Sequence, residues 1–162
     1  MDNSEVDDLL REATRAFERK PERKEEGMDA DDEALVQLRK ACRLLEAARF
    51  LRENDGYYTV VIETSFVAIE RSLHFYLLNS TGMDGDEYVT HESLYERCLD
   101  ANLYSEDMME RFLRLWRENR SKTYYRQAVG GEEQAESVYE LAGAVHGFVV
   151  DYASKKHECV CS

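Results

Sequence analysis

The sequence predicts an all-α fold, an antiparallel helical bundle of about five to six helices. Apolar residues recur at helical spacing along most of the chain, and no segment of any length alternates in the manner of a strand. The single proline is Pro21, so no later position interrupts a helix as proline does. A chain of 162 residues has the usual size of one domain.

Composition shifts divide the chain into four parts. The N-terminal helix is expected over residues 1–20, where the helical pattern stops at Pro21. The segment 21–33 is a charged connector. The bundle domain is expected over residues 34–155, and residues 156–162 are expected to form a flexible tail.

Turn signals separate the first helices of the bundle. Asn54-Asp55-Gly56 ends the helix that begins near Ala34. The next helix, about Tyr57 to Asn79, is apolar over most of its circumference, so we expect it at the centre of the bundle. A loop over residues 80–86 follows, and Gly130-Gly131 precedes the last helix.

Two helices are expected between that loop and the glycine pair. The first spans about residues 91–103, and Ser105 is placed to cap the second. The apolar stripe of the second helix includes Trp116 and continues at helical spacing into Arg120. Arg120 is therefore expected on the inward side of its helix.

The central helix carries a polar stripe that could partner this arginine. Thr59, Glu63, Glu70 and His74 follow one another at i, i+4, i+11 and i+15. Because an unpaired buried charge costs several kcal/mol, Arg120 is expected to pair with an acid of this stripe. Such a pair would either fix the helix register or line a polar pocket at a cleft or a dimer seam, and the sequence leaves both open.

The charge balance is strongly acidic. The net charge is −13, and only six of the 21 basic residues are lysines, against 34 acidic residues. This balance excludes attraction of the whole molecule to nucleic acid. It is typical of proteins of salt-accumulating cells, although an ordinary acidic protein is the alternative.

One segment reverses this balance. Residues 110–126 carry six basic residues against two acidic ones, and two adjacent tyrosines lie among them. Arginine beside tyrosine suits phosphate contact combined with base stacking, whereas a solvated helix face is the simpler interpretation. The residues concerned are Arg111, Arg114, Arg117, Arg120, Lys122, Tyr124, Tyr125 and Arg126.

The end of this helix, Leu115-Trp116-Arg117-Glu118-Asn119-Arg120-Ser121-Lys122-Thr123-Tyr124-Tyr125, resembles the motif of the HEPN superfamily of small helical domains. Family members carry an arginine there, often followed by asparagine, then a histidine four to six residues later and often a tyrosine. The resemblance implies a homodimer with facing motifs. It also implies activity as a metal-independent endoribonuclease toxin with a nucleotidyltransferase-type antitoxin.

The sequence departs from this motif at the histidine. Alignment on Arg117 places Lys122 there, and alignment on Arg120 places Tyr125 there. Unperturbed lysine and tyrosine titrate at about 10, so neither moves a proton readily at neutral pH. His74 or His146 could substitute in space, although buried structural histidines of the bundle are the alternative.

The resemblance assigns roles to the remaining residues. In an active site, Arg117 and Arg120 would hold the scissile phosphate, and Glu70 would orient the arginine. Tyr124 or Tyr125 would stack on a base or transfer a proton. In an inactive relative, these residues would bind a phosphate or nucleotide, or close a dimer interface.

The four cysteines suggest reduced thiols rather than a disulfide scaffold. His157, Cys159 and Cys161 could offer soft ligands to a metal, but the alternative is a frayed terminus. Cys42 lies on an apolar stripe and Cys98 is isolated, so no fourth ligand is evident. We therefore expect no metal site and no cofactor.

These observations leave three functions open and do not decide whether the protein is an enzyme. The first is an RNA- or nucleotide-acting HEPN-like homodimer, either a ribonuclease or a catalytically degenerate relative. The second is a non-catalytic interaction or dimerisation module of a salt-adapted cytoplasm. The third is a zinc-dependent regulator that uses the tail. The acidic start MDNSEVDDLL and the lack of a long apolar run predict a cytoplasmic protein without a membrane partner.

Overall fold

The structure, a computed structural model, confirms the all-α prediction. It describes residues 3–19, 25, 27–28, 30–54, 56–85, 87, 89–119, 129–153, 159 and 161. This part of the chain contains six helices and no strand. The helices are α1 (Asn3–Phe17), α2 (Glu33–Glu53), α3 (Tyr58–Ser80), α4 (His91–Asp100), α5 (Glu106–Asn119) and α6 (Glu132–Tyr152).

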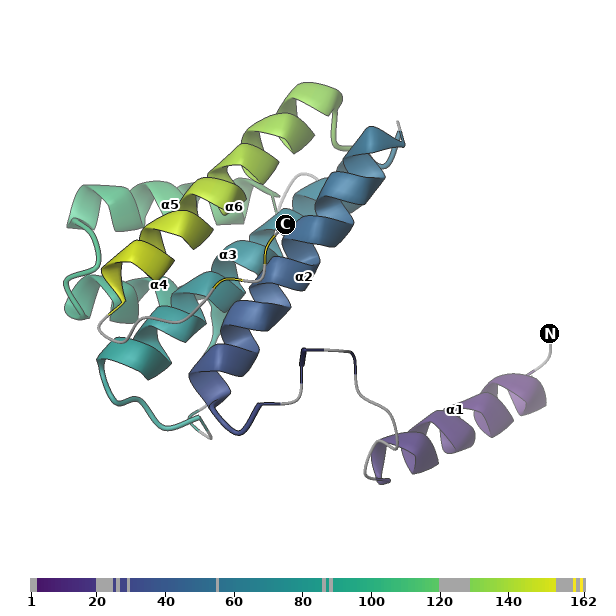
Figure 1. Cartoon of the computed structure of the whole chain (residues 1–162). Coiled ribbons are helices and arrows are strands. Elements are labelled where there is room, and N and C mark those ends of the chain that lie inside the picture. The colour runs from purple at the N-terminus through teal and green to yellow at the C-terminus, as the bar shows by residue number, and fades with distance from the viewer. Residues whose placement is uncertain are drawn as a thin grey trace.

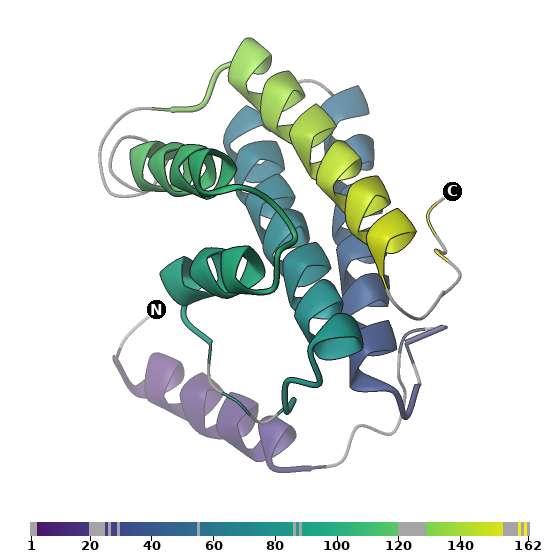
Figure 2. The same cartoon turned by 90° about the vertical axis from the view of Figure 1, so that its left-hand side faces the viewer.

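Helix α3 lies at the centre of the bundle, as its apolar circumference predicts. It packs against α2, α4 and α6, and α4 packs in turn against α5. Figure 2 shows α4 and α5 together on one side of α3, with α2 on the other side. The main core lies between these helices and includes Leu38, Leu73 and Phe75, which are at most 1% exposed. Helix α3 can therefore offer side chains to both sides of the molecule.

Capping residues explain where α4 begins and ends. The Thr90 hydroxyl accepts a hydrogen bond from the Ser93 amide, and the Ser93 hydroxyl accepts one from the Thr90 amide. At the other end, Asn102 adopts a left-handed conformation with φ 56°. The amide of Leu103 then donates to the Cys98 carbonyl at 2.9 Å, which closes the helix. The helix consequently ends three residues before the predicted Leu103.

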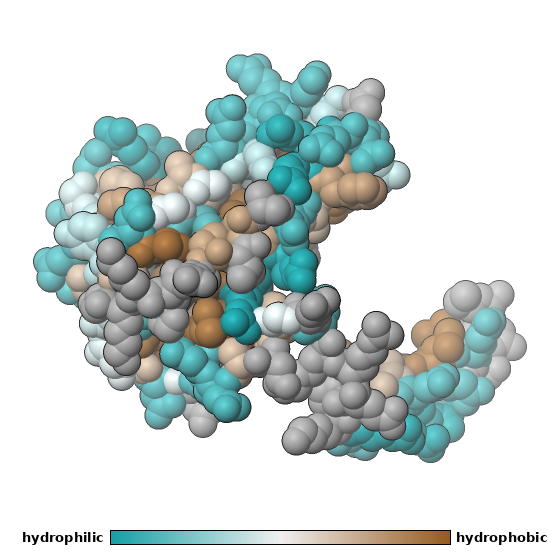
Figure 3. All heavy atoms as spheres, in the orientation of Figure 1, coloured by the Kyte–Doolittle hydropathy of each residue, from teal (hydrophilic) through white to brown (hydrophobic). Residues whose placement is uncertain are grey.

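Helix α1 is amphipathic but lies beside the bundle rather than within it (Figure 1). Its large apolar side chains Val6, Leu9, Leu10 and Phe17 are 52–93% exposed. In Figure 3, brown apolar atoms are visible on this helix at the lower right.

Among the residues that the structure describes, no helix is both long and apolar enough to cross a bilayer.

Candidate metal centre

The structure describes only part of the site predicted on the HEPN-like motif. Arg120, Lys122, Tyr124 and Tyr125 all lie outside the described residues. Arg117 is exposed on α5, and its Nε donates to Glu92 Oε1 of α4 at 3.0 Å. Arg117 is thus held against α4.

Glu70 has a partner that sequence reasoning missed. Its carboxylate lies 2.7 Å from His91 Nδ1, and Glu70 is only 9% exposed. The His91 ring stacks on Trp116 with 5.6 Å between the centroids. Among the described residues, Glu70 therefore orients a histidine at the start of α4. No spacing signal in the sequence links His91 to Glu70.

The polar stripe on α3 serves several separate contacts. Thr59 Oγ1 accepts a hydrogen bond from the Gly130 amide at 3.1 Å. His74 lies half-buried elsewhere on the helix, where desolvation, helped by the charges of Arg71 and Lys40, lowers its pKa. The described members of this stripe thus do not form one pocket around a common partner.

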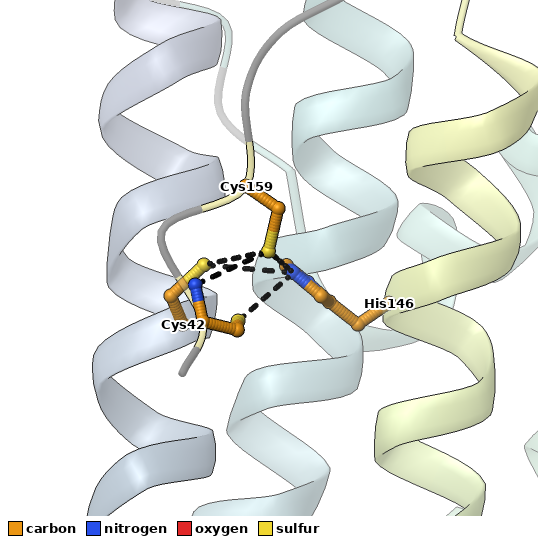
Figure 4. Close-up of side chains that lie close together, drawn as sticks. Cys42, His146 and Cys159 are labelled. Carbon is orange, nitrogen blue, oxygen red and sulfur yellow. Dashed lines mark hydrogen bonds between the residues drawn. The ribbon is translucent and has the colours of Figure 1, made fainter.

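Among the described residues, a dense group of reactive side chains lies instead between α2, α6 and the C-terminal tail. Cys42 on α2, His146 on α6, and Cys159 and Cys161 in the tail bring four potential ligand atoms within 4.8 Å of one another. Figure 4 shows Cys42, His146 and Cys159 converging from these three parts of the chain. The sequence separates Cys42 from the other three by more than a hundred residues, and the bundle brings them together.

Helix packing places Cys42 and His146 at this point. Cys42 belongs to the buried face of α2, and His146 follows Val145 on the buried face of α6. Cys42 is 1% and His146 4% exposed. Both positions are therefore fixed by the core, whereas Cys159 and Cys161 are exposed.

The three sulfurs surround one nitrogen of the histidine. His146 Nε2 lies 3.0 Å from Cys159 Sγ, 3.3 Å from Cys161 Sγ and 3.5 Å from Cys42 Sγ. Cys42 Sγ and Cys159 Sγ are 3.4 Å apart. In a tetrahedral zinc site, bonds of about 2.3 Å to sulfur and 2.0–2.1 Å to nitrogen separate neighbouring ligand atoms by about 3.5–3.8 Å. The four separations above are up to about 0.5 Å shorter than these values, and every pair of ligand atoms lies within 4.8 Å.

Ser72 on α3 determines which ring nitrogen of His146 carries the proton. The Ser72 hydroxyl donates its one hydrogen to the Ala68 carbonyl at 2.8 Å. It also lies 3.1 Å from His146 Nδ1, so it must accept a hydrogen bond from Nδ1–H. The proton on Nδ1 leaves the Nε2 lone pair directed toward the three sulfurs, the orientation that a metal-binding histidine needs.

The thiols of the cluster differ in how readily they ionise. A hydrogen bond from Cys161 holds the pKa of the Cys42 thiol well below its usual value. Desolvation raises the pKa of Cys159, and the hydrogen bond with Cys42 raises that of Cys161. Burial raises the pKa of the remaining thiol, Cys98, to about 12. A thiolate, the form that binds metals, is therefore favoured in the cluster and disfavoured at Cys98.

The sequence does not predict this cluster, because two of its ligands belong to a tail motif and the other two to the apolar pattern of the core helices. The tail motif was recognised as a possible ligand source, but Cys42 and His146 have the spacing of ordinary core residues. His157, the third tail residue considered, lies outside the described residues. The structure provides the two further ligands that the tail lacked.

Comparison with known proteins gives a family without an assigned activity. No curated protein and no solved structure matches the chain. A family model described as "Domain of unknown function (DUF8154)" matches residues 1–161. The protein therefore belongs to the DUF8154 family.

Proposed function

We propose that this protein binds one zinc ion through Cys42, His146, Cys159 and Cys161, and that the ion fastens the C-terminal tail to the bundle. The observation that carries the proposal is the convergence of three sulfurs on His146 Nε2, at 3.0–3.5 Å. The chain thus supplies a complete set of four ligands.

The chemistry of the ligands favours zinc. Three thiolates and one imidazole form a soft set, which disfavours the hard ions Mg²⁺ and Ca²⁺. Tetrahedral Cys₃His is a common ligand set of structural zinc sites, whereas catalytic zinc sites keep a position open for water. With four protein ligands, the centre has a structural or regulatory role rather than a hydrolytic one.

The position of the site indicates what the ion does. Helices α2 and α6 pack against each other and against α3 without help from the tail. Cys159 and Cys161, by contrast, are exposed and lie outside the helices, so a metal ion would add an attachment between them and the bundle. Zinc would supply it, because binding to the folded form alone stabilises by about 2.7 kcal/mol at a free concentration of 100 Kd.

Zinc loading tests this proposal. We expect the reduced full-length protein to retain one equivalent of zinc after dialysis, measured by elemental analysis alongside protein concentration. Cys159→Ser should lose most of that zinc, whereas Cys98→Ala, which alters a thiol outside the cluster, should retain it. Retention of zinc by Cys159→Ser, or no zinc in the folded wild type, would contradict the proposal.

We also propose a second function, in which an HEPN-like homodimer binds or cleaves RNA or a nucleotide through the segment around Arg120. The supporting observation is a surface cavity of about 470 Å³ that Arg114 and Arg117 line, together with Glu110, Leu113 and Glu118. The cavity lies on α5, the helix that leads into the Arg120 segment.

This second proposal has a separate test. End-labelled RNA would be incubated with zinc-loaded protein, without added divalent metal and across a potassium chloride series. Arg117→Ala and Arg120→Ala should lose cleavage or binding, whereas Arg11→Ala, on the exposed face of α1, should not. The proposal fails if folded wild-type protein neither binds nor cleaves RNA, or if Arg11→Ala is equally impaired. Folding is checked by circular dichroism.

A further inference from the structure

Two sulfurs of the cluster are close enough to react with each other. We propose that a peroxide oxidises Cys42 and Cys159 to a disulfide, and that this oxidation expels the metal ion. The release of metal rests on the proposed zinc binding, whereas the pairing of the two cysteines rests on their own geometry.

The distance between the sulfurs supports this pairing. Cys42 Sγ and Cys159 Sγ are 3.4 Å apart, so they must approach by about 1.4 Å to reach the length of a disulfide bond. Cys42 is fixed on α2 within the core and is 1% exposed. Cys159 is exposed and lies outside the helices. The movement needed therefore falls on Cys159 rather than on the buried Cys42.

The difference in exposure sets the order of the reaction. Cys159 is exposed and Cys42 is buried, so a peroxide in solution reaches Cys159 first. The buried thiol is then placed to resolve the oxidised one, because the two sulfurs are already in contact. Exposed sensor cysteines are often arranged in this way beside a resolving cysteine.

The reaction consumes one peroxide for each disulfide. The Cys159 sulfur, after losing its proton to solvent or to zinc binding, attacks a peroxide oxygen and breaks the O–O bond, which gives a sulfenic acid at Cys159. The departing hydroxide or alkoxide takes up a proton as water or alcohol. Cys42 then attacks Cys159 Sγ, the S–O bond breaks, and the departing hydroxide takes up a proton as water. The two sulfurs are oxidised, and the peroxide is reduced.

Oxidation would remove half of the metal ligands. A disulfide sulfur is a far weaker ligand than a thiolate, so only Cys161 and His146 would continue to bind zinc. Two ligands do not form a closed zinc site. The ion would leave, and a covalent bond would replace it as the attachment between α2 and the tail.

Cys98 is the matched control within the same chain. It is as buried as Cys42, and its sulfur lies near the Leu73 carbonyl rather than near another sulfur in the described structure. Burial raises its pKa. It should remain a thiol under the conditions that oxidise the pair.

The experiment treats zinc-loaded full-length protein with hydrogen peroxide. Released zinc is measured with a colorimetric chelator, and disulfides are mapped by peptide mass spectrometry under non-reducing conditions. We expect one zinc released for each Cys42–Cys159 disulfide, Cys98→Ala to behave as wild type, and reducing agent to restore zinc binding. A Cys159–Cys161 disulfide, a sulfinic acid at Cys159, or unchanged thiols would each overturn the inference.

Metal-free protein treated in parallel separates this inference from the proposed function. If the wild type binds no zinc but forms the Cys42–Cys159 disulfide, the proposed zinc site fails and the cysteine pairing is supported. If the wild type binds zinc and neither form makes the disulfide, the redox inference fails and the zinc site remains. Cys159→Ser should leave Cys42 as a thiol under the same treatment.

Discussion

Two histidines of this bundle are each oriented by a hydrogen bond to oxygen, but they face different surroundings. His146 is 4% exposed, Ser72 accepts from its Nδ1–H, and three sulfurs surround its Nε2. The His91 side chain is 51% exposed, bonds to Glu70 and stacks on Trp116. The first environment gathers soft ligands from three distant segments, whereas the second joins neighbouring helices at the surface.

The two histidines differ in how many potential metal ligands surround them. Around His91, one ring nitrogen bonds to a carboxylate and the ring face packs on an aromatic side chain. Around His146, by contrast, four potential ligand atoms from three segments lie within 4.8 Å of one another. Zinc binding is therefore expected to depend on the environment of His146 and not on that of His91.

The largest effect is expected from removing a ligand fixed by the core. Loss of a residue that hydrogen-bonds to a metal ligand typically lowers metal affinity by roughly 10–100-fold. Cys42→Ser removes a ligand itself, so it should lower zinc affinity by more than that. Affinity is measured by competition with a chromophoric chelator. Cys98→Ser is the control, and an equal loss in this variant would point to general unfolding rather than to a lost ligand.

A smaller loss is expected from the residue behind His146. Ser72→Ala removes the acceptor for Nδ1–H, so zinc affinity should fall by about 10–100-fold while the four ligands stay in place. Ser65→Ala is a matched control, because Ser65 is also fully buried on α3 and its hydroxyl has no hydrogen-bond partner in the described structure. Equal affinities of the two variants would show that Ser72 does not position the histidine.

The fold was largely predictable from sequence, because its signals are local. Helical periodicity, the Asn54-Asp55-Gly56 stop and the cap at Ser105 predicted the helices, and Ser105 Oγ accepts from the Met108 amide at 3.4 Å. The end of α4 was missed by three residues, because the left-handed Asn102 that closes it gives no periodic signal. Local rules thus predict the presence of helices better than their ends.

The candidate site was predictable only in part, because its geometry is non-local. The tail cysteines were recognised as possible ligands, but Cys42 and His146 are indistinguishable from core residues in a periodicity pattern. Their convergence depends on how α2 and α6 pack over α3. The HEPN-like motif is the reverse case. Its residues are adjacent in the sequence, so the resemblance can be seen there, but most of them lie outside the described structure.

The His91 region should affect stability without affecting zinc. Glu70→Gln exchanges a carboxylate for a neutral amide at a partly exposed hydrogen bond, so the free energy of unfolding should fall by about 1 kcal/mol. Urea titration with and without chelator measures this change, and it should be the same in both. A change in zinc affinity in this variant would show that the two regions are coupled.

The smallest effect concerns pH. Desolvation lowers the pKa of His74, so the unfolded chain binds a proton at this residue more readily than the folded protein does. The resulting stability is complete above about pH 6.5 and is lost as the pH falls toward the lowered pKa of the folded state. Thermal unfolding of metal-free protein between pH 7.5 and 5, roughly the range in which histidine titrates, should fall less steeply for His74→Gln. Parallel curves for the two proteins would contradict this assignment.

The central claim is that three cysteines and one histidine hold a single zinc ion. X-ray absorption spectroscopy of the zinc-loaded protein tests it most directly, because the spectrum reports the type, number and distance of the ligands. We predict three sulfurs at about 2.3 Å and one nitrogen at about 2.0–2.1 Å. A shell of nitrogen and oxygen alone, or only two sulfurs, would show that the tail does not close the site over Cys42 and His146.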